Sequence, residues 1–327
     1  MPIAEPPAGL AVAGATPNYG AFKTGSLVLN GDMELTELVS GVWVPSLFTL
    51  AVESGMTAAW RRLATGVYAG TYSLECSITG LASGKSATFR QDVPLNWGSQ
   101  RDQLGLWHRL SFVQKAGATI VTNATARAVC TVLDANGSVL ATVLNLTSSF
   151  ATPSSGWTRR SMEFIPSNYM STDQMTQAMT LRVTLYVATS YTGAVSPAES
   201  ACFDNVVLEA ECALDRNFSL GGQLDEERET SFERTNDALR TLYQASSGNG
   251  TAKRIGTIPF RFVTESQRDK LHGIWLYGAR APYVVWYPVM AGYPDSIDIV
   301  FDRKWSFPFE HADTDIGYRG TLAWMEH

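Results

Sequence analysis

The stretch Ala126-Arg-Ala-Val-Cys-Thr-Val-Leu133, followed by Asp134-Ala-Asn-Gly137 and Val139-Leu140, decides the fold class of this chain. Apolar and polar side chains alternate along residues 126–133, as expected for a β-strand with one covered face. Asn136 and Gly137 tolerate the positive φ angles of a tight turn, so the chain is expected to reverse there. The stretch therefore predicts a β-hairpin.

Further strand-like segments lie on both sides of this hairpin. Ser26-Leu-Val-Leu29, Ser73-Leu-Glu-Cys-Ser-Ile78 and Leu181-Arg-Val-Thr-Leu-Tyr-Val187 show the same alternation of apolar and polar side chains. Such strands, separated by turns rich in Gly, Ser, Asn and Pro, indicate a β-sandwich. We therefore predict a mainly β protein.

Length and composition exclude several classes of protein. The 327 residues, with 45% hydrophobic and 17% charged, leave room for two domains with real cores. The net charge of −6 lacks the basic excess that binding to a phosphate backbone needs, so we expect no nucleic-acid partner. No apolar run approaches the roughly 20 residues that span a bilayer, so we expect no membrane insertion. The cysteines lack metal-type spacing and are expected to be buried, reduced thiols.

Changes in composition divide the chain into three parts. Residues 1–25 are turn-rich without periodicity and predict an extended N-terminal arm. Residues 26–210 carry the sandwich pattern. A charge-dense run at 225–234 follows, and we place the boundary of a last domain, residues 211–327, at about 211 to 222.

The last part predicts a small α+β domain. Strand-like segments lie at residues 258–263, 283–287, 296–301 and 318–324. Between the first two, Thr264 is a helix N-cap candidate with Gln267 three residues later. Leu271, Ile274 and Trp275 then fall on one face of that helix.

The order of several motifs resembles a known family. Asn30-Gly-Asp-Met-Glu34 opens the sandwich region, Gly156-Trp157-Thr158 lies within it, and Cys202-Phe-Asp-Asn-Val-Val-Leu-Glu209 closes it. Over about residues 27 to 210, this order resembles the jelly-roll carbohydrate-binding modules of families 4, 9 and 22. The resemblance implies an N-terminal jelly-roll β-sandwich that binds and does not catalyse.

The same resemblance implies a structural Ca²⁺. Its ligands would be Glu34, carbonyl groups from Gly70 to Ser73, and Asp204, and calcium suits such a set because it accepts six to eight oxygens. Asn205 stands where the family usually has a second Asp. The alternative is that Asp204 caps a turn and Glu34 pairs with an arginine.

Sugar binding in such modules needs exposed aromatic rings. The candidates are Trp43, Trp60, Trp97 and Trp107, and Trp97 lies in the polar turn Asn96-Trp97-Gly98. We choose Trp43 and Trp97 as glycan-binding residues. The alternative for each tryptophan is packing in the core or at an edge.

The stretch from Ala281 to Pro294 is rich in aromatic residues and proline, a composition that favours an interface. We expect some of it to be buried strand and predict an assembly interface at Tyr283, Trp286, Tyr287 and Tyr293. The order of strands and helix in residues 211–327 is similar to domains of phage tail and baseplate proteins. This resemblance implies tail proteins and further copies of this chain, in a ring or oligomer, as partners.

The sequence carries none of the common catalytic motifs. It has no Gly-x-Ser-x-Gly and no His-Glu-x-x-His, and its four histidines are scattered. Together with this absence, the two resemblances imply a non-enzymatic structural protein of a phage virion, a tail or baseplate component whose outward-facing sandwich binds host glycans. The alternative is a binding module of a polysaccharide-degrading system, and a hydrolase with an unrecognised site is a third class.

Overall fold

The computed structural model of the chain describes residues 20–327, apart from 53, 55, 82–85, 118–123, 150–155, 190–193, 215–222, 228–252, 282, 288–295, 303 and 313–314. Strands joined in antiparallel sheets dominate this part of the chain, which confirms the mainly β prediction. The chain forms two compact units: one is Ser26–Glu211, and the other combines the residues before Ser26 with those from Cys212 onward. Among the described residues, no helix is long and apolar enough to cross a membrane.

The first sheet of the Ser26–Glu211 unit has the strand order β10-β9-β12-β7-β4, with antiparallel neighbours throughout. Its hairpin confirms the one predicted from the sequence: Asp134 Oδ1 accepts the N–H groups of Asn136 and Ser138, and Gly137 has φ +78°. The strands are β4 (Thr49–Val52), β7 (Ser86–Pro94), β9 (Ala124–Leu133), β10 (Val139–Ser149) and β12 (Thr180–Thr189).

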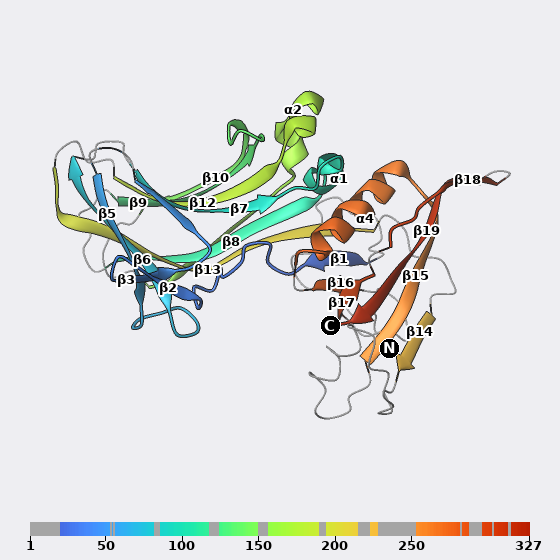
Figure 1. The fold of residues 1–327 in the computed structure, drawn as a ribbon, viewed down its shortest axis with the longest axis horizontal. Helices are drawn as coiled ribbons and strands as arrows, with labels where there is room; N and C mark the ends of the chain where they lie inside the picture. The colour runs from blue at the N-terminus through green and yellow to red at the C-terminus, as the bar shows by residue number, and fades with distance from the viewer. Residues whose placement is uncertain are drawn as a thin grey trace. The chain divides into compact units, whose positions relative to one another are not determined.

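The second sheet of this unit is built around β13 (Ala194–Ala213), which pairs with β6 (Ser73–Leu81) on one side and β8 (Trp107–Ala116) on the other. β5 (Met56–Leu63) pairs with β6, and β11 (Thr158–Phe164) pairs with β8. Figure 1 shows the two sheets as two layers. This is the predicted N-terminal sandwich.

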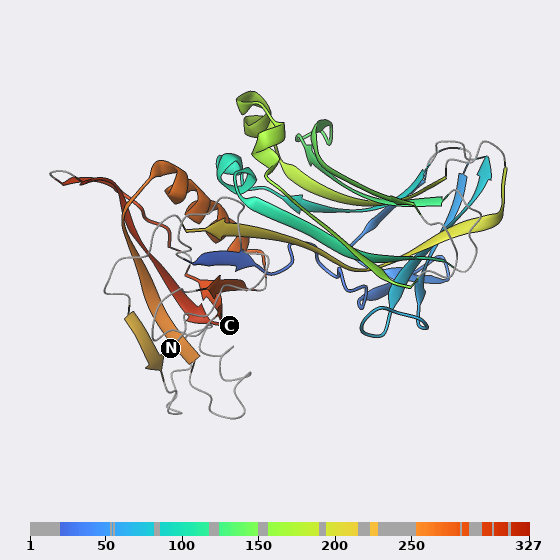
Figure 2. The same cartoon turned by 180° about the vertical axis from the view of Figure 1, so that it is seen from behind.

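Smaller elements surround the sandwich. β2 (Thr36–Val39) and β3 (Val42–Pro45) form a separate two-stranded hairpin. Helix α1 (Gln100–Leu104) follows β7, while the 3-10 helix η1 (Pro166–Tyr169) and helix α2 (Thr172–Gln177) precede β12. Figures 1 and 2 place the β2–β3 hairpin and helix α1 at different ends of the sandwich.

The core of the sandwich comes from the alternating apolar positions of its strands. Leu181, Val183, Leu185 and Val187 of β12 have no exposed surface, as expected when every second residue faces inward. Two aromatic rings stack on Phe89: Phe48 at 4.6 Å and Trp60 at 4.7 Å between ring centroids. The cysteines Cys76, Cys130, Cys202 and Cys212 are buried and free, as the sequence predicts.

In its described residues, the second unit contains one sheet and one long helix. The sheet contains β1 (Ala21–Thr24), β16 (Val284–Tyr287), β17 (Ile297–Phe301), β19 (Asp315–Glu326), β15 (Lys253–Val263) and β14 (Gln223–Glu227), in that order, and β18 (Phe309–Ala312) also pairs with β19. Helix α4 (Glu265–Gly278) packs against β1, β17 and β19. The predicted α+β fold of this region is confirmed, with β14 and β18 as strands that the sequence pattern missed.

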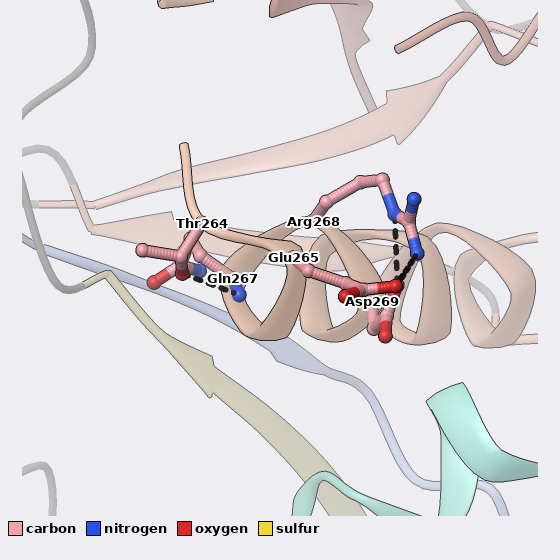
Figure 3. Close-up of polar contacts among 5 residues, drawn as sticks. All are labelled: Thr264, Glu265, Gln267, Arg268 and Asp269. Carbon is pink, nitrogen blue, oxygen red and sulfur yellow. Dashed lines mark hydrogen bonds and ion pairs between the residues drawn. The ribbon is translucent and has the colours of Figure 1, made fainter. Parts of the chain in front are cut away.

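Helix α4 begins where the sequence predicts. The Thr264 hydroxyl accepts the N–H of Gln267 at 3.1 Å and so caps the free end of the helix (Figure 3). Leu271 and Ile274 are fully buried, which confirms the predicted apolar face. Trp275 is only half-buried, and its indole N–H donates to the carbonyl of Asp302 at 2.9 Å.

The predicted N-terminal arm needs a correction within its described part. Residues Ala21–Thr24 form strand β1, which pairs antiparallel with β16 through Ala21–Tyr287 and Phe22–Trp286. Phe22 has no exposed surface and stacks on Trp286, with 6.2 Å between the ring centroids. These residues are part of a core, because a partner strand far along the sequence supplies the hydrogen bonds and the apolar contact. Residues 1–19 of the predicted arm lie outside the described residues.

Candidate functional site

The opening and closing motifs of the sandwich meet at one loop, residues 68–73. Glu34 Oε1 accepts the backbone N–H groups of Thr71 (2.6 Å) and Tyr72 (3.0 Å). Asp204 Oδ2 accepts those of Tyr68 (3.3 Å) and Ala69 (3.4 Å) and the hydroxyl of Ser73 (2.9 Å). The structure therefore brings together Glu34, Gly70, Ser73 and Asp204, the four residues predicted to hold a metal.

Two glycines make this approach of chain segments possible. Gly70 has φ +67°, and a Cβ atom there would lie 2.2 Å from Glu34 Oε1. A Cβ atom on Gly31, in the opening motif, would lie 1.8 Å from the carbonyl oxygen of Val206 in the closing motif. A larger residue at position 31 would push the two motifs apart because the clash is with backbone, whereas at position 70 it would strain the positive φ and displace the Glu34 carboxylate.

The pKa values of the two carboxylates at this site are shifted in opposite directions. Hydrogen bonds from backbone N–H groups, that of Tyr72 first, lower the pKa of Glu34. Burial raises the pKa of Asp204, although the Ser73 hydroxyl and three backbone N–H groups favour its ionised form. Asp204 is 1% exposed, so it depends on these donors for its solvation.

The hydrogen-bond arrangement at this site does not suit a calcium ion. Calcium needs six to eight oxygen ligands, whereas the loop turns N–H groups, which carry partial positive charge, toward both carboxylates. Within the described ranges, no three Asp, Glu, His or Cys side chains gather into a metal-binding group. Asp204 caps the 68–73 turn, as the alternative interpretation has it, but Glu34 accepts backbone N–H groups and forms no ion pair with an arginine among the described residues. Calcium binding is left to the metal-removal experiment described in the Discussion.

The predicted glycan-binding tryptophans are exposed but lie on different elements. Trp43 is 44% exposed on β3, and the Arg62 guanidinium lies between its ring (4.6 Å) and that of Tyr72 (4.3 Å). Trp97 is 75% exposed in the turn between β7 and α1. Trp60, a further candidate, is 3% exposed and belongs to the core. The sugar-binding role of Trp43 and Trp97 stays a prediction.

A second group of polar side chains lies on the outer face of the sheet β10-β9-β12-β7-β4. Since Leu181, Val183 and Leu185 face the core, Arg182, Thr184 and Tyr186 of β12 lie on the opposite face of the sheet, where Arg182 and Tyr186 are half-buried and Thr184 is buried by its neighbours. The strand register gives their cross-strand neighbours on β9 and β7. Arg182 lies between Thr131 and Asp92, Thr184 between Val129 and Arg90, and Tyr186 between Arg127 and Thr88.

Three arginines dominate this outer face. Arg182 forms a bidentate ion pair with Asp92, with Nε–Oδ1 at 2.6 Å and Nη2–Oδ2 at 2.8 Å. The Arg127 guanidinium lies 4.3 Å from the centroid of the Tyr186 ring. In the described part of the chain, no carboxylate pairs with Arg90 or Arg127. The face thus combines an aromatic ring with unpaired donors of hydrogen bonds to oxygen.

Sequence reasoning missed this group. The alternation along residues 181–187 was sufficient to assign Arg182, Thr184 and Tyr186 to the outer face. The neighbours Arg127 and Arg90 come from strands about sixty and ninety residues away, and only the register reveals them.

The residues predicted for an assembly interface differ in how much of their surface is exposed. Trp286 is 1% exposed and packs against Phe22 and Trp324, so it is a core residue and its prediction as an interface residue is wrong. Tyr283 and Tyr287, at either end of β16, are half-buried. Tyr293 lies outside the described residues. The interface role of the three tyrosines stays a prediction.

Comparison with known proteins gives structural similarity only. No family model and no curated protein sequence matches the chain. The enzymatically active domain of tailspike protein 4 from bacteriophage CBA120 is 16% identical, with a TM-score of 0.36, over 57% of this chain and 21% of that chain. The C-terminal family 22 carbohydrate-binding module of Clostridium thermocellum Xyn10B is 15% identical, with a TM-score of 0.32, over 55% of this chain and 93% of the module. A CBM28 module specific for non-crystalline cellulose is 12% identical, with a TM-score of 0.36, over 57% and 96%.

Proposed function

We propose that this protein is a non-enzymatic glycan-binding protein and that its sandwich binds sugar through the outer face of β10-β9-β12-β7-β4. The observation that carries the proposal is the row Arg127–Tyr186–Thr88, next to the row Val129–Thr184–Arg90. An aromatic ring offers apolar area to a sugar, while arginine and threonine side chains hydrogen-bond its oxygens. Such a combination of apolar area with a few fixed polar groups is typical of ligand sites.

A glycan array followed by calorimetry tests this proposal. We expect the intact protein to bind at least one class of glycan, and Tyr186→Ala to weaken that binding by about 1–3 kcal/mol, a loss typical of a central contact residue. Tyr186→Phe, which keeps the ring, should retain most of the affinity. The matched control is Tyr169→Ala, because Tyr169 is a 52% exposed tyrosine of η1 in the same unit. Absence of binding across the array would show that the sandwich is architectural.

Trp43 and Trp97 provide a second set of contacts to test. Both rings are exposed, and neither lies on the outer-face rows of the sheet. Loss of binding in Trp43→Ala or Trp97→Ala, with Tyr186→Ala unaffected, would move the glycan site to the β2–β3 hairpin or to the turn before α1.

The second candidate function is a structural role in a phage virion, in a tail or baseplate. The observations that favour it are aromatic side chains in the unit that holds α4: Trp275 and Trp305 are half-buried, with 5.7 Å between their ring centroids, and Phe309, which packs on Tyr318, is 59% exposed. Exposed apolar side chains that gather in one region are typical of contacts with other proteins. Tail proteins and further copies of this chain would be the partners.

Electron microscopy of the purified full-length protein, and of the particles that contain it, tests the virion role. Rings or particle-bound density would support a virion component. A monomer that is found only with polysaccharide-degrading enzymes would instead support the alternative, a binding module of such a system.

A further inference from the structure

The outer face of the five-stranded sheet β10-β9-β12-β7-β4 is positively charged, although the protein as a whole is acidic. The chain has a net charge of −6. The described outward positions on β9, β12 and β7 nevertheless include Arg127, Arg182 and Arg90, and Asp92 is the acidic residue among them. Because Asp92 is held by Arg182 in a bidentate ion pair, its charge is already neutralised.

The Arg127 guanidinium can pair with a negatively charged ligand. Its Nε atom is buried and has no hydrogen-bond partner in the described part of the chain. A buried donor without a partner is unfavourable, and stacking on Tyr186 fixes the plane of the guanidinium without satisfying its N–H groups. Because the Nε atom is buried, a planar oxyanion from solution would pair with the two terminal Nη groups of the guanidinium.

Arg90 adds a second positive charge on the same side of the sheet. Its side chain is half-buried on β7 at the position that pairs with Thr184, and none of the ion pairs among the described residues includes it. Arg127 on β9 and Arg90 on β7 lie on either side of β12 and are offset by two residues along the strands. Their Cα atoms are therefore about 12 Å from each other. Such a separation suits an extended ligand that carries more than one negative group.

We infer that this face binds an acidic polysaccharide of the uronic-acid type. Sugar carboxylates pair with the Arg127 and Arg90 guanidinium groups, while the half-buried Tyr186 side chain contacts a sugar ring. The inference rests on the proposed glycan-binding function and names the class of its ligand. The net negative charge of the protein would repel such a polymer elsewhere, so recognition depends on these arginines.

The test uses the full-length protein and two ligands with the same sugar backbone: oligogalacturonate, which is charged, and its fully methyl-esterified form, which is neutral. We expect the acidic ligand to bind at least about tenfold more tightly, and its affinity to fall as salt is raised. Arg90→Gln and Arg127→Gln should each weaken binding of the acidic ligand about tenfold. Arg160→Gln is the matched control, because Arg160 is an exposed arginine of β11 in the other sheet.

The outcomes separate this inference from the proposed function. Equal binding of both ligands, still lost in Tyr186→Ala, would leave the glycan site in place and overturn the preference for acidic sugars. Equally tight binding of duplex DNA in competition would also overturn the inference, because it would show a general polyanion surface. Binding of neither ligand, with other glycans bound through Tyr186, would again refute the acidic class alone.

Discussion

Ser73 donates its hydroxyl to Asp204 Oδ2 at 2.9 Å, and this bond joins the start of β6 to the middle of β13. Both side chains are buried, with Ser73 at 0% and Asp204 at 1% exposure. The contact lies between residues 131 positions apart in the sequence, so it links the early and late halves of the sandwich.

Ser73→Ala should therefore destabilise the sandwich. Removal of the hydroxyl leaves a buried carboxylate with fewer donors, which costs about 1–3 kcal/mol. Urea unfolding followed by tryptophan fluorescence measures the free energy of unfolding. Ser138→Ala is the control, because the Ser138 side chain is exposed in the β9–β10 turn. Equal stability of the two variants would show that Asp204 does not need the Ser73 hydroxyl.

The hydrogen bonds of the 68–73 loop also predict how the protein responds to metal removal. Since Glu34 and Asp204 accept N–H groups of the loop, we expect the melting temperature to stay unchanged in excess chelator. Glu34→Gln should lower the free energy of unfolding by about 1 kcal/mol, because a neutral acceptor replaces a charged one. A melting temperature that falls in chelator and recovers with added Ca²⁺ would instead establish the calcium site.

His108 predicts a loss of stability in mild acid. The side chain is 1% exposed, and burial lowers its pKa from 6.5 to about 4, although the hydrogen bond with the Leu106 carbonyl opposes this shift. Below about pH 6.5 the His108 side chain takes up a proton in the unfolded chain, whereas in the folded chain it stays neutral down to about pH 4. The free energy of unfolding should therefore fall between pH 6.5 and pH 4, by up to about 3 kcal/mol, and this contribution is fully present only above pH 6.5.

The measurement is denaturant unfolding from about pH 7 to about pH 4, for the wild-type protein and His108→Asn. The variant lacks the titrating group in both states, so its stability should fall less steeply over this range. Parallel pH profiles for the two proteins would show that other groups cause the acid sensitivity.

The N-cap of helix α4 gives a prediction for the second unit. Thr264→Ala removes the acceptor of the Gln267 N–H and should lower the free energy of unfolding by about 1 kcal/mol. Thr264→Ser keeps the hydroxyl and serves as the control, with stability close to that of the wild type. The ion pairs of Arg268 with Glu265 and Asp269 in the same helix do not involve Thr264, so both variants should keep them (Figure 3). If the alanine variant matched the serine variant, the cap would contribute nothing to stability.

Local patterns were sufficient to predict much of the fold. The β9–β10 hairpin and the start of α4 follow from residues within a few positions of one another, so the sequence reveals them directly. Strand β1 could not be predicted in this way. Its residues lie in a turn-rich segment, and their partner β16 is far away in the sequence.

Long-range contact also explains the wrong prediction for Trp286. The aromatic-rich and proline-rich stretch that contains Trp286 favours an interface. Phe22 and Trp324, from the two ends of the chain, nevertheless pack against its ring. At the candidate site, the resemblance carried by the motif order implied that Glu34 and Asp204 lie close together, and the structure places both at the 68–73 loop. The pairing of Arg127 with Tyr186 depends on register between strands, which alternation alone does not define.

The pairing of β1 with β16 has a consequence for synthesis on the ribosome. Ala21 leaves the ribosome early, yet its partner Tyr287 is translated roughly 15 to 50 s later at ordinary elongation rates. The sandwich, contained within Ser26–Glu211, has all its strands before that moment, whereas β1 has none of its final hydrogen-bond partners from β16. The first described strand therefore waits for one of its two neighbours until the end of synthesis: β13 is already made, but the edge of β1 that pairs with β16 stays open in a nascent chain stalled before residue 284.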